Sequence, residues 1–243
     1  RSSAASDVYK RQYLGGVIMS ANKYGNTLTV ILIVIIIAVL LGGGILIYNY
    51  VIKPHNAEKE TAQAITEFDR TSEDQNQEEN SSNVDLGELA DQIDQAQSGN
   101  SGNGGKKKTY YKNFVMIGYI TIPKTNVKLP ILEETTPKAL ETSVAVIYPS
   151  NPQLNEPGNT VIIGHNYRNG KLFSNNKKLS VGDKVMIKDI SGRELTYIIY
   201  QKFETSPNDA SFYNRNTNGV PEITLSTCTD DSQKRIIIFA KAQ

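Results

Sequence analysis

The sequence predicts an all-β-dominated fold, a closed barrel of eight strands with short helices, preceded by an N-terminal transmembrane helix. Three observations support this prediction. Eight short apolar runs, rich in β-branched residues and bounded by turn signals, occupy residues 115–241. These runs show little helical periodicity. An uncharged apolar run of membrane-spanning length lies near the N-terminus.

The overall composition argues against nucleic-acid binding. The chain has 26 basic and 25 acidic residues, and it has no basic stripe with interleaved aromatic residues. Its one cysteine cannot form an internal disulfide, and the C-x-x-C pair of a structural zinc site is missing from the sequence. In an exported chain, a single cysteine indicates a reactive thiol or an intermolecular bridge.

The first residues lack the pattern of a folded segment. Residues 1–18 have no apolar period, and Met19 follows them. We therefore interpret residues 1–18 as a non-native lead-in and exclude them from the fold prediction. A genuine cytoplasmic extension is the alternative. Residues 19–27 are then predicted to form a short cytoplasmic tail.

The predicted transmembrane anchor covers residues 28–50. No charged side chain occurs between Tyr24 and Ile52, and about 20 consecutive apolar residues match a bilayer-spanning helix. A cleaved signal peptide is the alternative, but its apolar region is usually shorter and a small-x-small cleavage site should follow. Tyr48 and Tyr50 follow instead, and they are typical of residues at a membrane interface.

Residues 51–108 are predicted to form a stalk, acidic at first and then Gly/Ser-rich, that is largely disordered. Between Glu58 and Asp94 there are 12 acidic residues against two basic ones, and Phe68 is the only aromatic side chain. Such a composition cannot bury enough apolar surface to offset the entropy lost on ordering. The stalk is interpreted as a spacer, and the alternative is a segment that only adds solubility.

Residues 109–243 form the predicted barrel domain. Turn signals such as Ile122-Pro123 and Glu156-Pro157-Gly158-Asn159 separate its apolar runs. The eight expected strands are Val115–Ile122, Val127–Leu132, Val144–Ile147, Thr160–Gly164, Lys184–Lys188, Glu194–Phe203, Ile223–Thr227 and Ile236–Lys241.

Three reactive side chains stand at the ends of predicted strands. Cys228 ends one strand, Arg235 opens the next after a short polar turn, and His165 ends the run T-V-I-I-G-H. A cysteine nucleophile needs a nearby base or cation, and an arginine can stabilise a developing oxyanion without losing its proton. These residues are therefore candidates for acyl transfer. The alternatives are a cysteine acting as a small hydrophobe, a turn histidine and a surface arginine.

Three motifs resemble those of the sortases, the cysteine transpeptidases of Gram-positive surfaces. T-L-S-T-C, followed seven residues later by arginine, resembles the active-site signature of that family. I-I-G-H-N resembles its catalytic-histidine segment, and F-V-M-I-G-Y-I-T-I-P-K-T-N-V-K-L-P-I resembles its opening strands. The resemblance covers Tyr110 to the C-terminus and implies an eight-stranded sortase-like barrel. The stretch V-A-V-I-Y-P-S-N-P-Q-L-N-E-P-G-N departs from the Gly and His residues that many sortases carry there, so the subclass stays open.

The resemblance implies a two-step acyl transfer on a C-terminal sorting signal similar to L-P-x-T-G. Cys228 would attack the Thr–Gly carbonyl, His165 would protonate the leaving amine, and Arg235 would hydrogen-bond the oxyanion or the substrate backbone. An amine of a peptidoglycan precursor or of a pilin lysine would then resolve the thioester. Since this chemistry occurs outside the cell, the expected protein is a single-pass protein of the cell membrane with an extracellular catalytic domain.

Further expectations concern the substrate and cofactors. Leu225 and Thr227 lie on the cysteine strand and are expected to shape the substrate pocket, although Thr227 is equally well explained as strand filler. The loop from Glu204 to Pro221 would receive the sorting peptide. No cofactor is expected, because Glu133 and Glu134 are weak evidence for the calcium site that some sortases have.

Two other functions fit parts of the pattern. An L,D-transpeptidase-like enzyme of peptidoglycan cross-linking also places histidine before cysteine with an arginine nearby, but its cysteine usually follows Ser, His or Gly rather than T-L-S-T. The other function is that of a non-catalytic anchored binding barrel, in which Cys228 would be inert.

Overall fold

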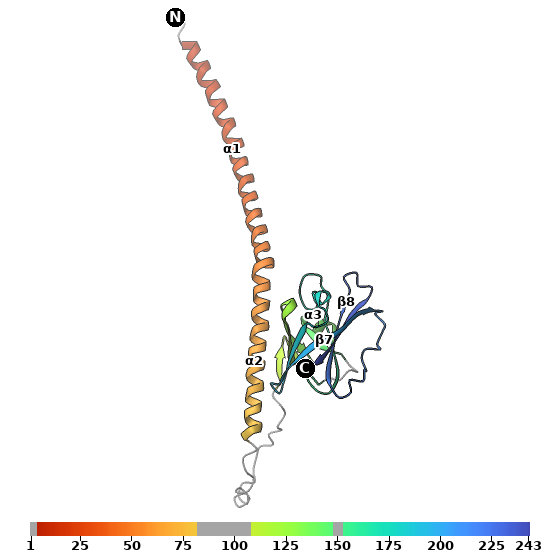
Figure 1. Ribbon diagram of the computed structural model, residues 1–243. Coiled ribbons are helices and arrows are strands. Elements are labelled where there is room, and N and C mark those ends of the chain that lie inside the picture. Colours follow the sequence, from red (N-terminus) through yellow and green to blue (C-terminus); the bar gives the residue numbers. More distant parts are fainter. Residues whose placement is uncertain (1–3, 82–107, 148–152) are drawn as a thin grey trace, which may run out of the picture. The chain divides into compact units, whose positions relative to one another are not determined.

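The computed structural model describes residues 4–81, 108–147 and 153–243 (Figure 1). The chain divides into two compact units between Lys59 and Glu60. The first unit is helical: α1, Ala4–Ile47, leads into a π-helical turn, Tyr48–Ile52, and then into the first residues of α2, Lys53–Ser81, whose remainder belongs to the second unit.

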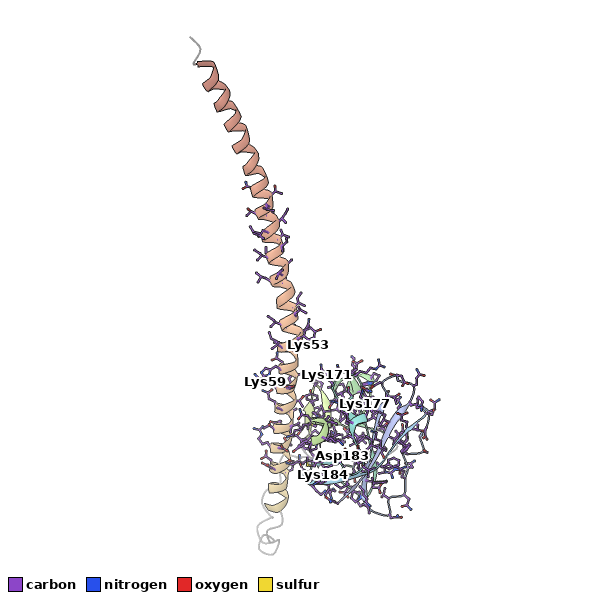
Figure 2. The ribbon with its side chains drawn as sticks, turned by 45° about the horizontal axis from the view of Figure 1, so that its top comes forward. Lys53, Lys59, Lys171, Lys177, Asp183 and Lys184 are labelled. Atoms are coloured by element: carbon purple, nitrogen blue, oxygen red, sulfur yellow. The ribbon has the colours of Figure 1, made fainter. Side chains whose placement is uncertain are left out.

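The predicted anchor lies within α1 and the π-helical turn. Its large hydrophobic side chains, from Leu28 to Ile52, are 44–77% exposed and stand out around the helix (Figure 2). By length and composition, this helix is able to cross a membrane. An apolar surface of this kind is stable only in contact with lipid or protein, which is consistent with the predicted anchor.

The second unit contains a closed ring of eight strands, as predicted. Following the hydrogen bonds, the order is β2-β3-β4-β5-β8-β9-β7-β6, and β6 pairs back to β2. The pairs β3–β4 and β5–β8 are parallel and the others are antiparallel. The strands are β2 Phe114–Ile122, β3 Val127–Leu132, β4 Val144–Val146, β5 Gly158–Ile163, β6 Lys184–Asp189, β7 Glu194–Thr205, β8 Pro221–Cys228 and β9 Arg235–Ala242.

The shorter elements decorate this ring. A ninth strand, β1 Thr109–Tyr111, pairs antiparallel with the start of β2 and was not predicted. The short helices are α3 Pro137–Thr142 and two 3₁₀ turns, Pro123–Thr125 and Asn176–Lys178. Thr136 caps α3, because its side-chain oxygen accepts a hydrogen bond from the amide of Ala139.

The alternation of side chains along the strands creates two apolar layers. On β9, Ile236, Ile238 and Ala240 belong to the core inside the barrel. Ile237 and Phe239 point the other way and form a second cluster with Val161 of β5 and Phe212 of the β7–β8 loop. This loop, residues 206–220, therefore covers part of the outer face of β5, β8 and β9.

The prediction of a largely disordered stalk is wrong for residues 53–81, which form α2. In this helix Ile65, Phe68 and Ser72 are buried at the spacing of one helical face. The prediction of disorder used the average composition of the whole segment. A narrow apolar stripe is enough to order a helix when the stripe packs against another surface. The remainder of the predicted stalk, residues 82–107, lies outside the described residues.

The partner surface is on β2. Ile65 and Phe68 pack with Met116 and Tyr119, and the rings of Phe68 and Tyr119 meet edge to face with centroids 6.1 Å apart. Burial raises the pKa of the Tyr119 hydroxyl to about 12, and the nearby Asp69 carboxylate adds to the increase. The compact unit that holds the barrel thus begins in α2, at Glu60.

Replacing Phe68 with alanine should lower the free energy of unfolding by about 3 kcal/mol, because a large aromatic side chain leaves a cavity against β2. Thermal unfolding of the full chain in detergent, followed by near-ultraviolet circular dichroism, measures this. The matched control is Glu67→Ala, one residue away, whose side chain is 49% exposed. If both variants melt at the wild-type temperature, α2 does not contribute to the stability of the barrel.

Candidate active site

The candidate site forms where three strands end. β5 and β8 run parallel, with Ile163 paired to Ser226, so the residues beyond them, His165 and Cys228, reach the same end of the sheet. β9 runs antiparallel to β8, and its first residue, Arg235, is paired with Cys228. The strand register therefore brings together the three side chains that the sequence predicts to be catalytic.

These three side chains line one pocket of about 170 Å³. Cys228, His165 and Arg235 are each half-buried, so they are accessible from the pocket and partly shielded from bulk water. The other lining residues are mainly apolar. They are Leu140, Ile147, Ile163, Gly164, Pro207, Asp209, Phe212, Tyr213, Ser226 and Thr227.

Arg235 contacts the cysteine directly. Its Nη1 donates a hydrogen bond to Cys228 Sγ. Because a guanidinium keeps its proton, it stays a positive charge beside the sulfur and beside any carbonyl oxygen that a substrate places there. The pocket thus holds a thiol and a fixed cation, and an imidazole lines the same pocket.

Gly164 positions His165. A Cβ atom at Gly164 would lie 2.8 Å from Cδ2 of Phe173, too close for any larger residue without a shift. The amide of Gly164 donates to the carbonyl of Ser226 over 3.2 Å, and the carbonyl of His165 accepts from the amide of Phe173 over 3.1 Å. The imidazole then lies against the ring of Tyr167, with centroids 5.2 Å apart. The backbone on both sides of the histidine is therefore fixed.

Asn166 joins the histidine segment to the cysteine turn, a role that the sequence analysis missed. Its Nδ2 donates to the carbonyl of Cys228 over 3.0 Å and to Oδ1 of Asp230 over 2.9 Å. Lys177, labelled in Figure 2, also donates to Asp230 and is the main cause that holds the pKa of this carboxyl below its usual range. The only sequence signal for this role was a polar residue directly after His165.

The two predicted substrate-binding residues have different positions. Leu225 is fully buried in the core and does not line the pocket, contrary to the prediction. Leu225 and Thr227 share the inner face of β8, but Leu225 lies two residues farther from the end of the strand, inside the barrel core. Thr227 does line the pocket, and its Oγ1 is buried with no hydrogen-bond partner among the described residues. A substrate contact for Thr227 stays a prediction.

The β7–β8 loop supplies a wall of the pocket through residues that the sequence analysis did not identify. Pro207, Phe212 and Tyr213 provide apolar surface, and Asp209 is the one carboxylate among the described lining residues. Hydrogen bonds from Ser211 and Thr205 hold the pKa of Asp209 below its usual range. The available signal was an aromatic pair inside an otherwise polar loop.

No metal-binding cluster of three His, Cys, Asp or Glu side chains occurs in the part of the chain that the structure describes. Glu133, considered for calcium, has its Oε2 4.0 Å from Nζ of Lys108. The expectation that no cofactor is needed stays a prediction.

The chain is similar to several known proteins. Residues 120–243 match the family model of the sortase domain. The chain is 28% identical over 201 residues to sortase A of Bacillus anthracis. This alignment covers 81% of this chain and 87% of that protein. Among solved structures, a sortase D5 transpeptidase of Clostridium perfringens is 33% identical, with a TM-score of 0.48 over 53% of this chain and 79% of that one. Sortase C1 of Streptococcus agalactiae is 29% identical, with a TM-score of 0.48 over 53% of this chain and 67% of that one.

Proposed function

The chain belongs to the sortase family, and from that premise we propose that it is a membrane-anchored cysteine transpeptidase. The proposed reaction cleaves a sorting signal similar to L-P-x-T-G between Thr and Gly, and joins the released protein to an amine. The observation that carries the proposal is one pocket in which Arg235 donates to the sulfur of Cys228 while His165 lines the same wall.

In the first step, Cys228 Sγ gives its proton to His165 and attacks the Thr carbonyl carbon, so that a tetrahedral oxyanion forms. Arg235 is placed beside the sulfur, where its fixed charge stabilises that oxyanion. His165 donates a proton to the departing glycine nitrogen, so the C–N bond breaks and a thioester remains on Cys228.

In the second step, an amine attacks the thioester carbonyl, passes its proton to His165 and releases the Cys228 sulfur. Water competes with the amine at this stage. Ile147, Ile163, Leu140 and other apolar side chains surround the reacting position, and such a lining disfavours bulk water while a bound amine gains effective concentration.

The proposed location follows from the apolar helix and the family. α1 is long and apolar enough to span a membrane, and sortases act on proteins displayed at the cell surface. We therefore place the barrel outside the cell, where sorting-signal proteins supply the acyl group. The acceptor is a peptidoglycan-precursor amine or a pilin lysine.

The test is mass spectrometry of the full chain in detergent, incubated with an L-P-x-T-G peptide. The expected result is an adduct at Cys228 and release of the glycine-terminated fragment. Adding a glycine-based peptide as an amine should raise the total rate and yield mainly amide product, because the amine and water compete for the same thioester.

Two results would contradict the proposal. A chain that forms no adduct with any sorting peptide, although its circular dichroism shows it folded, is not a sortase-type acyl transferase for these signals. A chain that forms the adduct but hydrolyses it regardless of glycine peptides and lipid-linked cell-wall precursor is a hydrolase.

A further inference from the structure

A polar cluster lies on the same outer face of β8 as the nucleophile, but nearer the start of the strand. Its centre is Arg215 of the β7–β8 loop. We propose that Arg215 is a positioning residue of the transfer reaction, which fixes this loop so that Phe212 and Tyr213 form the wall that receives the acyl-donor peptide. The kinetic part of this inference rests on the proposed function, whereas the structural part does not.

Arg215 contacts several strands of the barrel. Its guanidinium carbon lies 3.7 Å from the ring centroid of Phe239 on β9. Its Nη2 is 2.9 Å from Oε2 of Glu222 and donates to Oδ1 of Asn159 over 2.9 Å. Its Nη1 donates to the hydroxyl of Tyr200 over 2.6 Å. One side chain that is only 17% exposed thus contacts four strands, β5, β7, β8 and β9.

Asn159 relays this anchor to the pocket wall. Its Nδ2 donates to the backbone carbonyls of Phe212 and Tyr213, over 2.9 and 3.0 Å. Its Oδ1 accepts from Arg215 and, over 2.8 Å, from Oγ1 of Thr224. Because these two donors occupy the oxygen, the amide of Asn159 is oriented with its nitrogen toward the loop. Without Arg215, the side-chain oxygen of Asn159 would keep only one of the two donors that orient the amide.

Arg215 does not reach the reacting atoms. Glu222, Thr224, Ser226 and Cys228 alternate along β8 and share one face. Thr224, which accepts from Arg215 over 3.4 Å, is four residues from Cys228, or about 13 Å along an extended strand. Arg215 therefore acts through the loop, since Phe212 and Tyr213 line the pocket.

The ion pair between Arg215 and Glu222 allows an effect on the position of the loop to be distinguished from an effect on the stability of the fold. Glu222 is 12% exposed in its side chain and accepts from Arg215 and from the hydroxyl of Tyr200. Removing Arg215 alone leaves a largely buried carboxylate without its cation, which destabilises a fold. Removing both charges avoids that penalty. The loop, however, lacks its anchor in both cases.

The experiment compares Arg215→Met and the double variant Arg215→Met/Glu222→Met, each made in the full chain and studied in detergent. The matched control is Arg193→Met. Arg193 is a more exposed arginine that is bound to Asp189 and Glu156, and it does not line the pocket. Hydrogen exchange of residues 206–220 reports the loop, melting temperature reports stability, and alkylation of Cys228 by iodoacetamide reports the thiol.

We expect both Arg215 variants to show faster exchange in residues 206–220 while the amides of β8 and β9 stay protected. The value of kcat/KM for an L-P-x-T-G peptide should fall about 10- to 100-fold, mainly through KM, as expected for a displaced binding wall. Alkylation of Cys228 should be no slower than in the wild type. In the double variant, the melting temperature should return most of the way to the wild-type value. The value of kcat/KM should stay as low as in Arg215→Met.

Other outcomes overturn the inference. If kcat/KM recovers together with the melting temperature in the double variant, Arg215 has only a structural role. If residues 206–220 exchange at the wild-type rate in both Arg215 variants, or equally fast in Arg193→Met, Arg215 does not fix the loop. Hydrogen exchange needs no turnover, so it decides the structural claim even if the wild-type chain fails to process any sorting peptide.

Discussion

Replacing Cys228 with alanine should abolish both the acyl-enzyme and the transfer product. The thioester needs a sulfur nucleophile, and the chain contains no second cysteine that could substitute. The measurement is intact-protein mass spectrometry after incubation with the sorting peptide, together with chromatography of the released fragment. The variant should cleave the peptide no faster than buffer without enzyme does.

The variant must be shown to be folded. Cys228 is half-buried at the end of β8, so truncating its side chain removes little packing, and the melting temperature should stay near that of the wild type. A Cys228→Ala protein that melts normally and still joins peptide to amine would show that the nucleophile lies elsewhere.

Replacing Arg235 with alanine, or His165 with alanine, should each lower kcat/KM by at least about 100-fold, equivalent to about 2.7 kcal/mol of transition-state stabilisation. Arg235 donates to Cys228 Sγ, so its loss removes the fixed charge at the reacting position. His165 lines the same pocket, and its loss removes the proton donor for the leaving amine.

Two further variants separate these roles. Arg235→Lys keeps the charge but loses the planar fork, so it should retain part of the activity that Arg235→Ala loses. A donor with a good leaving group, such as an activated ester of the same peptide, needs less protonation, so it should rescue His165→Ala more than Arg235→Ala. Near-wild-type kcat/KM in either alanine variant would remove that residue from the proposed mechanism.

The eight barrel strands were predictable because their signal is local. Short apolar stretches rich in β-branched residues, with turn residues on either side, define the runs, and the observed strands agree with the predicted ones to within two residues at either end. β1 was missed because a three-residue strand has too little pattern. The packed half of α2 was missed for a different reason. Its stripe is short, and whether it folds depends on the surface that Met116 and Tyr119 present.

The site was predictable in part. His165, Cys228 and Arg235 could be found because strand ends and family motifs mark them. Leu225 was placed wrongly because adjacency in sequence was taken for adjacency in space, although the strand turns its side chain inward. The pocket wall could not be predicted, since the position of Phe212 depends on a hydrogen bond from Asn159, 53 positions away.

The parallel pairing of β5 with β8 has a consequence for the order in which the protein folds. The histidine and cysteine segments meet through contacts such as Asn166 to Cys228, 62 positions apart. Such pairs form late, because the entropy of closing a long loop is lost before the contacts compensate for it. A nascent chain therefore carries an unassembled nucleophile until the barrel closes. In the proposed mechanism such a chain could not be acylated by a sorting signal, so the reactivity of Cys228 toward a sorting peptide would report completed folding.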